Sequence, residues 1–422
     1  MMTAAGLAGC NSNGGQSDQS SSSQSDETIE LTYWYCWTGA VKENNDERVE
    51  EFNDSVGNEK NIHVTGEPQG SYDDLNAKLK TAFTANEEPD VCVLGISNTA
   101  AFYDSGLIQP IDDIIASDDL DDFWPGLMEN CYADSKLCGV PYLRSTPILY
   151  YNKTLFENAG LDPETAPATW DDVVSYSDAL KDVGVFGLGF FLDAFALSGL
   201  LRCNGCSFFG DDLDATEVAY NQPGGVELVQ WLRDGISSHN FSYLGGTNGS
   251  DSLASSIAGQ QVAIWMGSTA GLTNYLTVAS DNGFEVGCGF IPKHVQNQVP
   301  TGGCNLVMTS RLTDARREAA GEFINFMTSK DSAVKNHLKT GYLLTRKSDV
   351  DDERIVEAYK ETPQYQVAFD QMEYAVGEYM NAGYSEALKY YTDALERLFA
   401  TDDDIQTVLD DAAQQSAEAL GI

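Results

Sequence analysis

Apolar and polar residues alternate with two different periods along the chain from residue 28 onward. Residues 29–37 form an extended run rich in Tyr, Trp and Thr, and residues 90–95 form a short apolar run, which predicts two strands. Between them, residues 72–85 carry their apolar side chains at helical spacing and predict an amphipathic helix. Strands and helices that alternate with short connections predict an α/β fold with a parallel sheet flanked by helices.

The ends of two predicted strands are the first candidate ligand positions. In open parallel sheets, ligands bind beyond the carboxyl ends of the strands. Trp37 closes the first predicted strand, and Ser97 and Asn98 follow the strand at 90–95. We therefore predict that these three residues contact a ligand.

Two further extended stretches are better explained as connections between domains than as single strands. Residues 138–151 are almost continuously extended, contain two prolines and are long for one strand. Residues 302–308 are glycine-led and apolar. Several crossings between two lobes form a hinge, which a single linker does not. We therefore predict a ligand cleft between two lobes, with residues 28–143 plus about 300–343 in lobe one and residues 144–299 plus about 344–422 in lobe two.

Composition and charge narrow the function. The 422-residue chain is long enough for two or three domains, and its 42% of apolar residues can form a core. It carries 24 Lys and Arg against 65 Asp and Glu, which gives a formal net charge of −41. A surface this acidic repels phosphate backbones and anionic lipid headgroups, which argues against nucleic-acid binding and against peripheral membrane binding.

The N-terminus predicts a different route to the membrane. Leu7-Ala8-Gly9-Cys10 resembles the lipobox of bacterial lipoproteins, in which small residues precede an acylated cysteine. Nine residues precede Cys10 and none is Lys or Arg, so we interpret residues 1–10 as a truncated lipoprotein signal. Residues 11–27 are rich in Ser, Gln, Asn and Gly and predict a flexible tether. We expect an extracytoplasmic protein, held at the outer face of a bacterial cell membrane only through a lipid on Cys10.

Eight cysteines remain once Cys10 is set aside. Cys131 and Cys138 bracket a polar turn, and Cys203 and Cys206 have CxxC spacing, so each pair could form a local disulfide. A zinc site needs a second such pair or neighbouring histidines, and the four histidines lie far apart in sequence. We predict that these cysteines are small buried residues or structural disulfides, and that the protein binds no metal and no cofactor.

Three motifs that follow one another along the chain carry a family resemblance. They are Ser145-Thr146-Pro147, Gly302-Gly303 and Thr340-Gly341-Tyr342-Leu343. The chain resembles the extracellular solute-binding proteins of carbohydrate ABC importers, and the glycerol-3-phosphate-binding branch most closely. The resemblance implies a periplasmic-binding-protein-like fold of two α/β lobes that close on a ligand about a hinge. It also implies an ABC permease as partner and no chemistry on the ligand, and we expect a monomer.

The resemblance transfers five ligand positions to this chain, which are Tyr72, Ser145, Ser268, Gly303 and Tyr342. Two other positions depart from the branch. Ile96 stands where the branch carries a cleft glutamate, and residues 384–391 contain no arginine where the branch grips phosphate. A phosphate without a guanidinium loses its strongest bidentate contact, which favours a neutral mono- or oligosaccharide. Arg144 lies near the predicted cleft and could compensate, so glycerol 3-phosphate or a glycerophosphodiester stays the alternative ligand.

A sugar site also needs aromatic platforms and polar groups that both donate and accept hydrogen bonds. Trp37, Phe191 and Trp265 are the predicted platforms, and Asp193 is a candidate acceptor for hydroxyl groups. The complete predicted ligand set is Trp37, Tyr72, Ser97, Asn98, Arg144, Ser145, Phe191, Asp193, Trp265, Ser268, Gly303 and Tyr342. The apolar positions from Leu388 onward recur at helical spacing and are expected to pack on a lobe.

An enzyme is the alternative from another class. A glycoside hydrolase needs only two carboxylates about 5 to 9 Å apart, and a chain with 65 acidic residues does not exclude such a pair. Residues 332–335 and 339–341 match the S-x-x-K and K-T-G motifs of penicillin-recognising enzymes. Only three residues separate the two matches, whereas those motifs normally lie far apart in sequence. The hinge pattern and the lipid tether favour a binding protein over an enzyme.

Overall fold

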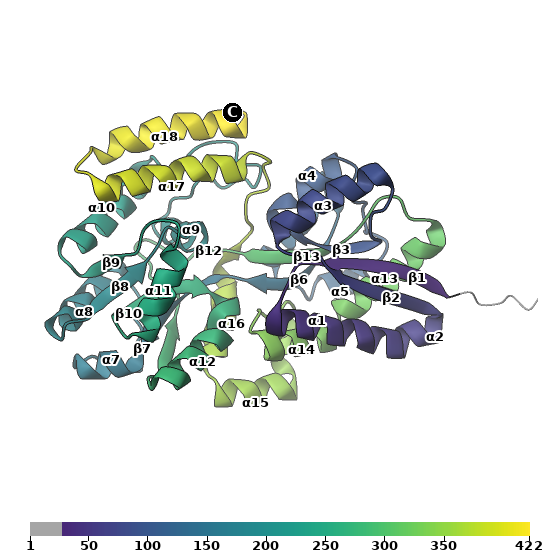
Figure 1. The fold of residues 1–422 in the computed structure, drawn as a ribbon, viewed down its shortest axis with the longest axis horizontal. Coiled ribbons are helices and arrows are strands. Elements are labelled where there is room, and N and C mark those ends of the chain that lie inside the picture. The colour runs from purple at the N-terminus through teal and green to yellow at the C-terminus, as the bar shows by residue number, and fades with distance from the viewer. Residues whose placement is uncertain (1–27) are drawn as a thin grey trace, which may run out of the picture.

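Two five-stranded sheets organise the protein, one in each of two lobes (Figure 1). This computed structural model describes residues 28–422. The strands of lobe one, in sheet order, are β2 (Ile62–Pro68), β1 (Ile29–Tyr35), β3 (Val91–Gly95), β13 (Gly302–Met308) and β6 (Val140–Ser145). Strand β1 pairs in parallel with β2 and β3, whereas β13 runs antiparallel to β3 and β6. The predicted strands at 29–37 and 90–95 are β1 and β3.

Lobe two holds the second sheet, on the left of Figure 1. Its strands, in sheet order, are β11 (Val286–Gly289), β7 (Pro147–Asn152), β10 (Val262–Ser268), β8 (Phe186–Phe190) and β9 (Phe241–Tyr243). Strands β10, β8 and β9 are parallel, and β7 is antiparallel to β10 and β11. Two short pairs complete the strands: β4 (Tyr132–Ala133) with β5 (Lys136–Leu137), and β12 (Val299–Pro300) with β14 (Ala375–Val376).

Helices cover both sheets. Those of lobe one are α1 (Gly39–Phe52), the π-helix η1 (Asn53–Gly57), α2 (Asn58–Lys60), α3 (Tyr72–Ala85), η2 (Ile96–Asn98), α4 (Thr99–Asp104), α5 (Ser117–Leu120), α6 (Pro125–Met128), η3 (Glu129–Cys131), α13 (Asp314–Met327) and α14 (Lys330–Thr340). Those of lobe two are α7 (Lys153–Asn158), α8 (Trp170–Asp182), α9 (Ala194–Cys203), α10 (Pro223–Ser237), α11 (Gly249–Ala258), η4 (Thr269–Gly271), α12 (Leu272–Asn282), α17 (Tyr384–Ala400) and α18 (Ile405–Leu420). The segment between α14 and α17 forms η5 (Lys347–Asp351), α15 (Glu353–Glu361), α16 (Gln364–Asp370) and η6 (Gln371–Tyr374).

Helix α3 shows how local sequence sets an element. The Ser71 side chain accepts a hydrogen bond from the Asp74 backbone N–H at 3.1 Å, and the Asp74 carboxylate accepts one from the Ser71 N–H at 3.0 Å. This capping box satisfies two backbone donors at the helix start. Leu75, Leu79 and Phe83 are buried on one face. The structure confirms the predicted helix over 72–85 and the predicted α/β fold.

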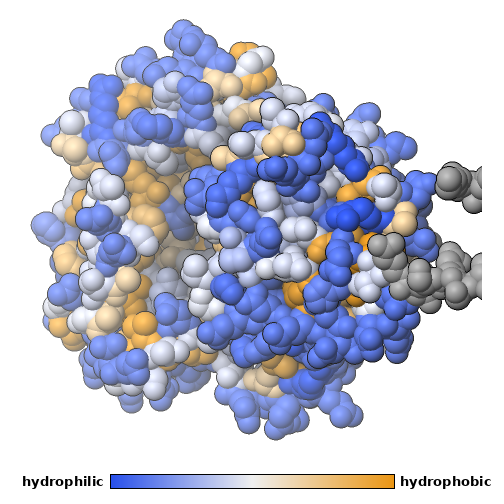
Figure 2. All heavy atoms as spheres, turned by 45° about the vertical axis from the view of Figure 1, so that its right-hand side comes forward, coloured by the Kyte–Doolittle hydropathy of each residue, from blue (hydrophilic) through white to orange (hydrophobic). Residues whose placement is uncertain are grey.

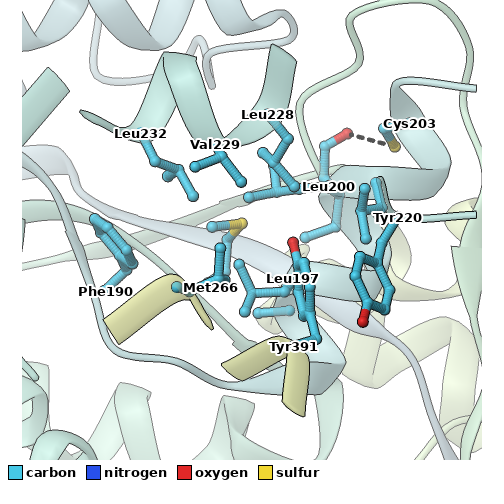
Figure 3. Close-up of a cluster of buried hydrophobic side chains, with 14 of the residues drawn as sticks. Phe190, Leu197, Leu200, Cys203, Tyr220, Leu228, Val229, Leu232, Met266 and Tyr391 are labelled. Carbon is cyan, nitrogen blue, oxygen red and sulfur yellow. Dashed lines mark hydrogen bonds between the residues drawn. The ribbon is translucent and has the colours of Figure 1, made fainter. Parts of the chain in front are cut away.

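The C-terminal helices complete the core of lobe two. Figure 3 shows side chains from β8, α9, α10, β10 and α17 in one cluster, including Phe190, Leu197, Leu228, Met266 and Tyr391. All five are buried. Because Tyr391 lies on α17, the chain from residue 384 onward packs on lobe two.

The predicted crossing over 138–151 resolves into two strands in different sheets. Strand β6 ends at Ser145 in lobe one, and β7 begins at Pro147 in lobe two. A single residue, Thr146, connects the two strands at this first crossing. A second crossing lies at Thr301, between β12 and β13. The chain still contacts lobe one beyond the expected bound near residue 344. Arg346 pairs with Asp119 of lobe one at 2.6 Å, and α15 packs against α14. Ile355 and Tyr359 of α15 also belong to a hydrophobic cluster with Trp265 of lobe two, so this segment contacts both lobes.

The described residues contain eight cysteines, from Cys36 to Cys304. All eight are free thiols, and six of them are buried. Cys138 donates its backbone N–H to the Cys131 carbonyl at 2.8 Å across the β4–β5 hairpin, yet the two side chains form no disulfide. The expectation of local disulfides is wrong, and the alternative of small buried residues describes this part of the chain. Cys10 and the predicted tether lie outside the described residues. Within residues 28–422, no helix is both long and apolar enough to cross a membrane.

Candidate functional site

A cavity of about 440 Å³ lies where the two lobes meet. Figure 2 shows the hollow between the lobes, with hydrophobic residues along its lobe-two side. The cavity is lined by Tyr72, Gly95, Ile96, Ser97, Asn98, Ser145, Asp193, Ala194, Phe195, Ser268, Thr301, Gly302, Gly303, Glu378, Tyr384 and Leu388. Its volume falls in the range of small-molecule sites in proteins.

The lobe-one wall follows from the parallel strands. Ser97 and Asn98 lie on η2, directly after the carboxyl end of β3, and Tyr72 is the first residue of α3. A methyl group placed on Gly95 would lie 3.5 Å from the Asn98 amide nitrogen and 3.8 Å from the Tyr72 ring, so these two side chains flank Gly95. The Tyr72 hydroxyl is buried and has no hydrogen-bond partner among the described residues. This wall therefore offers polar groups at the edge of the sheet.

The floor is formed by the two crossings. Ser145 ends β6, Thr301 lies at the second crossing, and Gly302 and Gly303 begin β13, which pairs with β6 through a bulge after Gly303. Gly303 has φ of 98°, and a Cβ there would lie 2.0 Å from the Leu143 carbonyl oxygen. Only glycine adopts this conformation at so close an approach. The bulge leaves backbone groups of β13 at the cavity surface.

The lobe-two wall is more apolar. It contains Ala194 and Phe195 at the start of α9 and Leu388 on α17, together with Asp193, Ser268 and Tyr384. Asp193 caps α9, because its carboxylate accepts a hydrogen bond from the Phe195 N–H at 3.1 Å. Burial raises the pKa of Asp193, and the backbone N–H groups at the helix start oppose that rise. A methyl group on Gly302 would lie 2.9 Å from the Phe195 ring, so this ring reaches the floor.

A second carboxyl group, that of Glu378, lies in the same cavity and is only 6% exposed. Its Oε1 accepts a hydrogen bond from the Tyr379 N–H at 3.0 Å. Burial raises the pKa of Glu378, whereas the Arg202 guanidinium, the Tyr379 N–H and the Tyr384 hydroxyl favour the ionised form. The cavity thus holds two carboxyl groups, and no Lys or Arg lies among the described side chains that line it.

The sequence family described as bacterial extracellular solute-binding protein matches residues 47–367, which is more than half of the chain. The protein belongs to this family. Among curated relatives, the sn-glycerol-3-phosphate-binding periplasmic protein UgpB of Agrobacterium fabrum is 29% identical over 332 residues, covering 74% of this chain and 73% of that protein. UgpB of Brucella melitensis is 28% identical over 359 residues, with 81% and 80% covered.

Solved structures show the same fold. The cyclic α-maltosyl-1,6-maltose binding protein of Arthrobacter globiformis superposes with a TM-score of 0.82 at 23% identity, covering 93% of this chain and 99% of that one. UgpB of Mycobacterium tuberculosis, solved in complex with glycerophosphocholine, superposes with a TM-score of 0.79 at 22% identity and the same coverage. As a member of the family, the protein is a solute-binding protein, and the resemblance seen in the sequence is confirmed.

Seven of the twelve predicted ligand residues line the cavity of this solute-binding protein, which are Tyr72, Ser97, Asn98, Ser145, Asp193, Ser268 and Gly303. They come from both lobes and both crossings, and the structure brings them together. Their contact with a ligand stays a prediction.

Arg144 was predicted to contact the ligand, but its side chain is completely buried beneath the floor of the cavity. The guanidinium donates hydrogen bonds to the Gly302 carbonyl at 3.0 Å, the Leu127 carbonyl at 2.8 Å, Asn305 Oδ1 at 3.0 Å and Thr301 Oγ1 at 2.9 Å. With its donors engaged by protein groups, it does not reach the cavity. The predicted role of Arg144 as a cleft cation is wrong in this structure.

The two tryptophans that were predicted as aromatic platforms, Trp37 and Trp265, do not line the cavity. Trp265 is completely buried and stacks on Tyr150 with ring centroids 5.9 Å apart, so it offers no face to a ligand. Trp37 is 9% exposed and packs between Tyr35 and Tyr142. Both tryptophans are core residues because sheets and helices cover their rings. The structure therefore does not support their predicted role as stacking platforms.

Phe191 and Tyr342 lie beside the cavity rather than on its lining. Phe191 packs with its Cβ close to Gly249 and belongs to the hydrophobic cluster around Trp265. Tyr342 packs against the core of lobe one, and its hydroxyl lies near Cys36 and Cys304. Neither side chain lines the cavity, and their contact with a ligand stays a prediction.

Phe195, Glu378, Tyr384 and Leu388 line the cavity but escaped the sequence analysis. Leu388 also packs on the lobe-two core, as expected, but that is only part of its role. Phe195 is two residues from the predicted Asp193, so the aromatic content of this stretch was a usable signal. Glu378 had no local signal, because a single acid in a chain with 65 of them carries no pattern.

Proposed function

We propose that the protein captures a neutral mono- or oligosaccharide in the cleft between its lobes and delivers it to the permease of an ABC importer. The observation that carries this proposal is the charge of the lining: two carboxyl groups, Asp193 and Glu378, and no lysine or arginine among the described side chains of the cavity. A phosphate ester would meet two acids and no guanidinium there. A neutral polyol meets acceptors for its hydroxyl groups.

The two walls also match the two sides of a sugar. A pyranose has an apolar C–H face and a rim of hydroxyls, and an aromatic ring packs well against that face. Phe195, Tyr384 and Leu388 supply an apolar wall, whereas Ser97 and Asn98 face it with polar groups. A cavity of about 440 Å³ lies within the range of small-molecule sites and has room for a mono- or disaccharide.

Lobe closure and a lipid anchor belong to the same proposal. Asn98 lies on lobe one and Tyr384 on lobe two, so a small ligand contacts both fully only when the lobes approach. A ligand that binds the closed state more tightly shifts the protein toward it. Small-angle scattering should therefore report a smaller radius of gyration with saturating saccharide, and identical curves would contradict closure. Acylation of Cys10 would hold the protein beside the permease.

Glycerol 3-phosphate is the second candidate, because the curated relatives at 29% and 28% identity carry that ligand in their names. A panel separates the two candidates: maltose, maltotriose and tagatose against sn-glycerol 3-phosphate and glycerophosphocholine. Each is tested by melting shift and calorimetry, and the mixture is then analysed for cleavage products. At a hundredfold excess over Kd, a bound ligand stabilises the folded protein by about 2.7 kcal/mol.

We expect a melting shift with at least one saccharide and an unchanged sugar afterwards. A shift with the phosphate esters alone would overturn the carbohydrate proposal in favour of the second candidate. Released monosaccharide would overturn the binding function itself in favour of a hydrolase, in which the two cavity carboxyl groups would be the first residues to test.

A further inference from the structure

The position of Glu378 is set by a chain of buried hydrogen bonds under the cleft. The Arg144 guanidinium donates to Asn305 Oδ1 at 3.0 Å, and Asn305 Nδ2 donates to the Asn130 carbonyl at 2.9 Å. The Asn130 side chain makes two hydrogen bonds to the backbone of Glu378. Its Oδ1 accepts from the Glu378 N–H at 2.8 Å, and its Nδ2 donates to the Glu378 carbonyl at 2.6 Å. Arg144, Asn130 and Asn305 are completely buried.

This chain links the crossings between the lobes. Arg144 lies on β6 next to the first crossing, Asn305 lies on β13 after the second, and Asn130 lies on η3 of lobe one. Glu378 lies between contacts to the two lobes, because Asn130 of lobe one holds its backbone and its successor Tyr379 is anchored in lobe two. The Tyr379 hydroxyl donates to the Gly210 carbonyl at 2.7 Å and accepts from the Phe209 N–H at 3.1 Å.

The backbone before Glu378 is held equally closely. Gly377 donates its N–H to the Glu129 carboxylate at 2.5 Å, and a Cβ on Gly377 would lie 2.8 Å from that carboxylate oxygen. The glycine therefore permits a close approach that fixes the loop against η3. With its backbone fixed on lobe one, Glu378 directs its side chain to the cavity, where Tyr384 of lobe two also lies.

A second buried charge stands behind this carboxyl group. Arg202 on α9 is 4% exposed, and its guanidinium lies 5.4 Å from the Tyr379 ring centroid. The Arg202 Nε is buried and has no hydrogen-bond partner among the described residues. A buried guanidinium is costly unless a negative charge compensates it, and the Arg202 guanidinium favours the ionised form of the Glu378 carboxyl group.

We infer that Glu378 is a specificity-determining residue of the cleft: its carboxylate accepts hydrogen bonds from ligand hydroxyls and disfavours anionic ligands. This inference rests on the proposed carbohydrate function. Asp193, the other acid of the cavity, is held by the start of its own helix, where its carboxylate caps α9. The backbone of Glu378 is instead held by the buried hydrogen bonds that run from Arg144 through Asn305 and Asn130.

Calorimetry with two variants tests the inference. The probe is whichever of maltose, maltotriose and tagatose binds the wild-type protein most tightly. Glu378→Gln keeps the side-chain shape and the acceptor for the Tyr379 N–H while it removes the charge. Because Arg202 then lacks this compensating charge, the variant should melt at a lower temperature, and the titrations are run well below that temperature. We expect Kd to rise by about tenfold to a hundredfold, the effect of hydrogen bonds to a charged acceptor. Glu373→Gln, an exposed acid five residues away, is the matched control and should bind as wild type.

The pH dependence of Kd isolates the role of Arg202. Burial raises the pKa of Glu378, so wild-type affinity should fall with decreasing pH at values above the usual glutamate range. Arg202 on α9, Tyr384 on α17 and the neighbouring Tyr379 interact with this carboxyl group. Two further acids are nearby: Asp193 lines the same cavity, and Glu129 on η3 accepts from the Gly377 N–H. Arg202→Met should move the fall to higher pH, whereas Arg202→Lys should keep it close to wild type. Glu378→Gln should remove this dependence.

The outcomes separate the two levels of the proposal. If a saccharide binds wild type and Glu378→Gln with equal affinity and the same pH profile, this inference is overturned while the carbohydrate function stands. If no saccharide binds but glycerol 3-phosphate does, the proposed function is overturned. Glu378→Gln would then bind the phosphate ester more tightly, because a repelling charge has been removed. Melting curves of every variant verify that each one is folded.

Discussion

Replacing Arg144 by Met tests whether this arginine serves the fold or the ligand. Its guanidinium is completely buried and donates to four uncharged acceptors, two backbone carbonyls and the side chains of Thr301 and Asn305. These acceptors belong to α6, to Thr301 at the second crossing and to β13, so the side chain joins both crossings to lobe one. Methionine keeps much of the apolar stem and removes every donor.

The magnitude follows from two opposing effects. Each buried acceptor left without a donor costs about 1–3 kcal/mol, so four of them cost roughly 4–12 kcal/mol. Removing a buried guanidinium returns several kcal/mol of desolvation cost. The net destabilisation should be about 3 kcal/mol, which lowers the melting temperature by roughly 6–12 °C for a folding unit of 150–250 residues.

The assay combines thermal melting with calorimetry of saccharide binding at low and high salt. Saccharide affinity should change only a few-fold and equally at both salt concentrations, because the guanidinium does not touch the ligand. Arg397→Met is a matched control, since Arg397 is exposed on α17 and pairs with Asp403 at 2.7 Å. An exposed pair of this kind is worth at most about 1 kcal/mol.

The reverse pattern would refute this reasoning. An Arg144→Met protein that melts with the wild type but loses binding in a salt-sensitive way would show that the guanidinium acts on the ligand. The charge of the cleft would then need to be reassigned, and a phosphate ester would become the better ligand.

Three further predictions address the floor, the wall and the pH dependence of stability. Gly303→Ala should lower the free energy of unfolding, measured by chemical denaturation, by several kcal/mol, because its Cβ would lie 2.0 Å from the Leu143 carbonyl oxygen. Gly283→Ala is the control: with φ of 73° and open space around it, it should lower the free energy of unfolding by only about 1 kcal/mol. Equal losses for the two variants would count against the close approach at Gly303. Tyr384→Ala should weaken saccharide binding about tenfold by calorimetry, the effect of one lost aromatic contact, and unchanged affinity would remove it from the site. Burial raises the pKa of Asp349 in the folded protein to about 7. Between about pH 4 and pH 7, this carboxyl group is therefore protonated in the folded protein but ionised in the unfolded chain. The free energy of unfolding should fall as the pH rises through this range. Asp349→Asn should therefore stabilise the protein at pH 8 by up to about 4 kcal/mol and hardly at pH 4, and a constant difference across pH would contradict the assignment.

Sequence periodicity determined the elements of lobe one and the place of the site among them. The helical spacing over 72–85 and the strand at 90–95 reappear as α3 and β3. Ser97 and Asn98 were predicted at the cavity from strand order alone, because parallel strands present their carboxyl ends at one edge. These features are local or follow from topology, so neighbouring residues suffice to define them.

Tertiary structure alone decided which of the predicted side chains are exposed. Trp265 and Ser268 lie on the same strand, yet packing of β10 between β7 and β8 buries the tryptophan and leaves the serine at the strand end in the cavity. Arg144 precedes Ser145 by one residue but points below the floor, where distant carbonyls satisfy it. Glu378 joins the site only because Asn130, 248 residues away, holds its backbone. Burial and hydrogen bonding depend on contacts between distant segments, and the order of residues along a single chain does not record them.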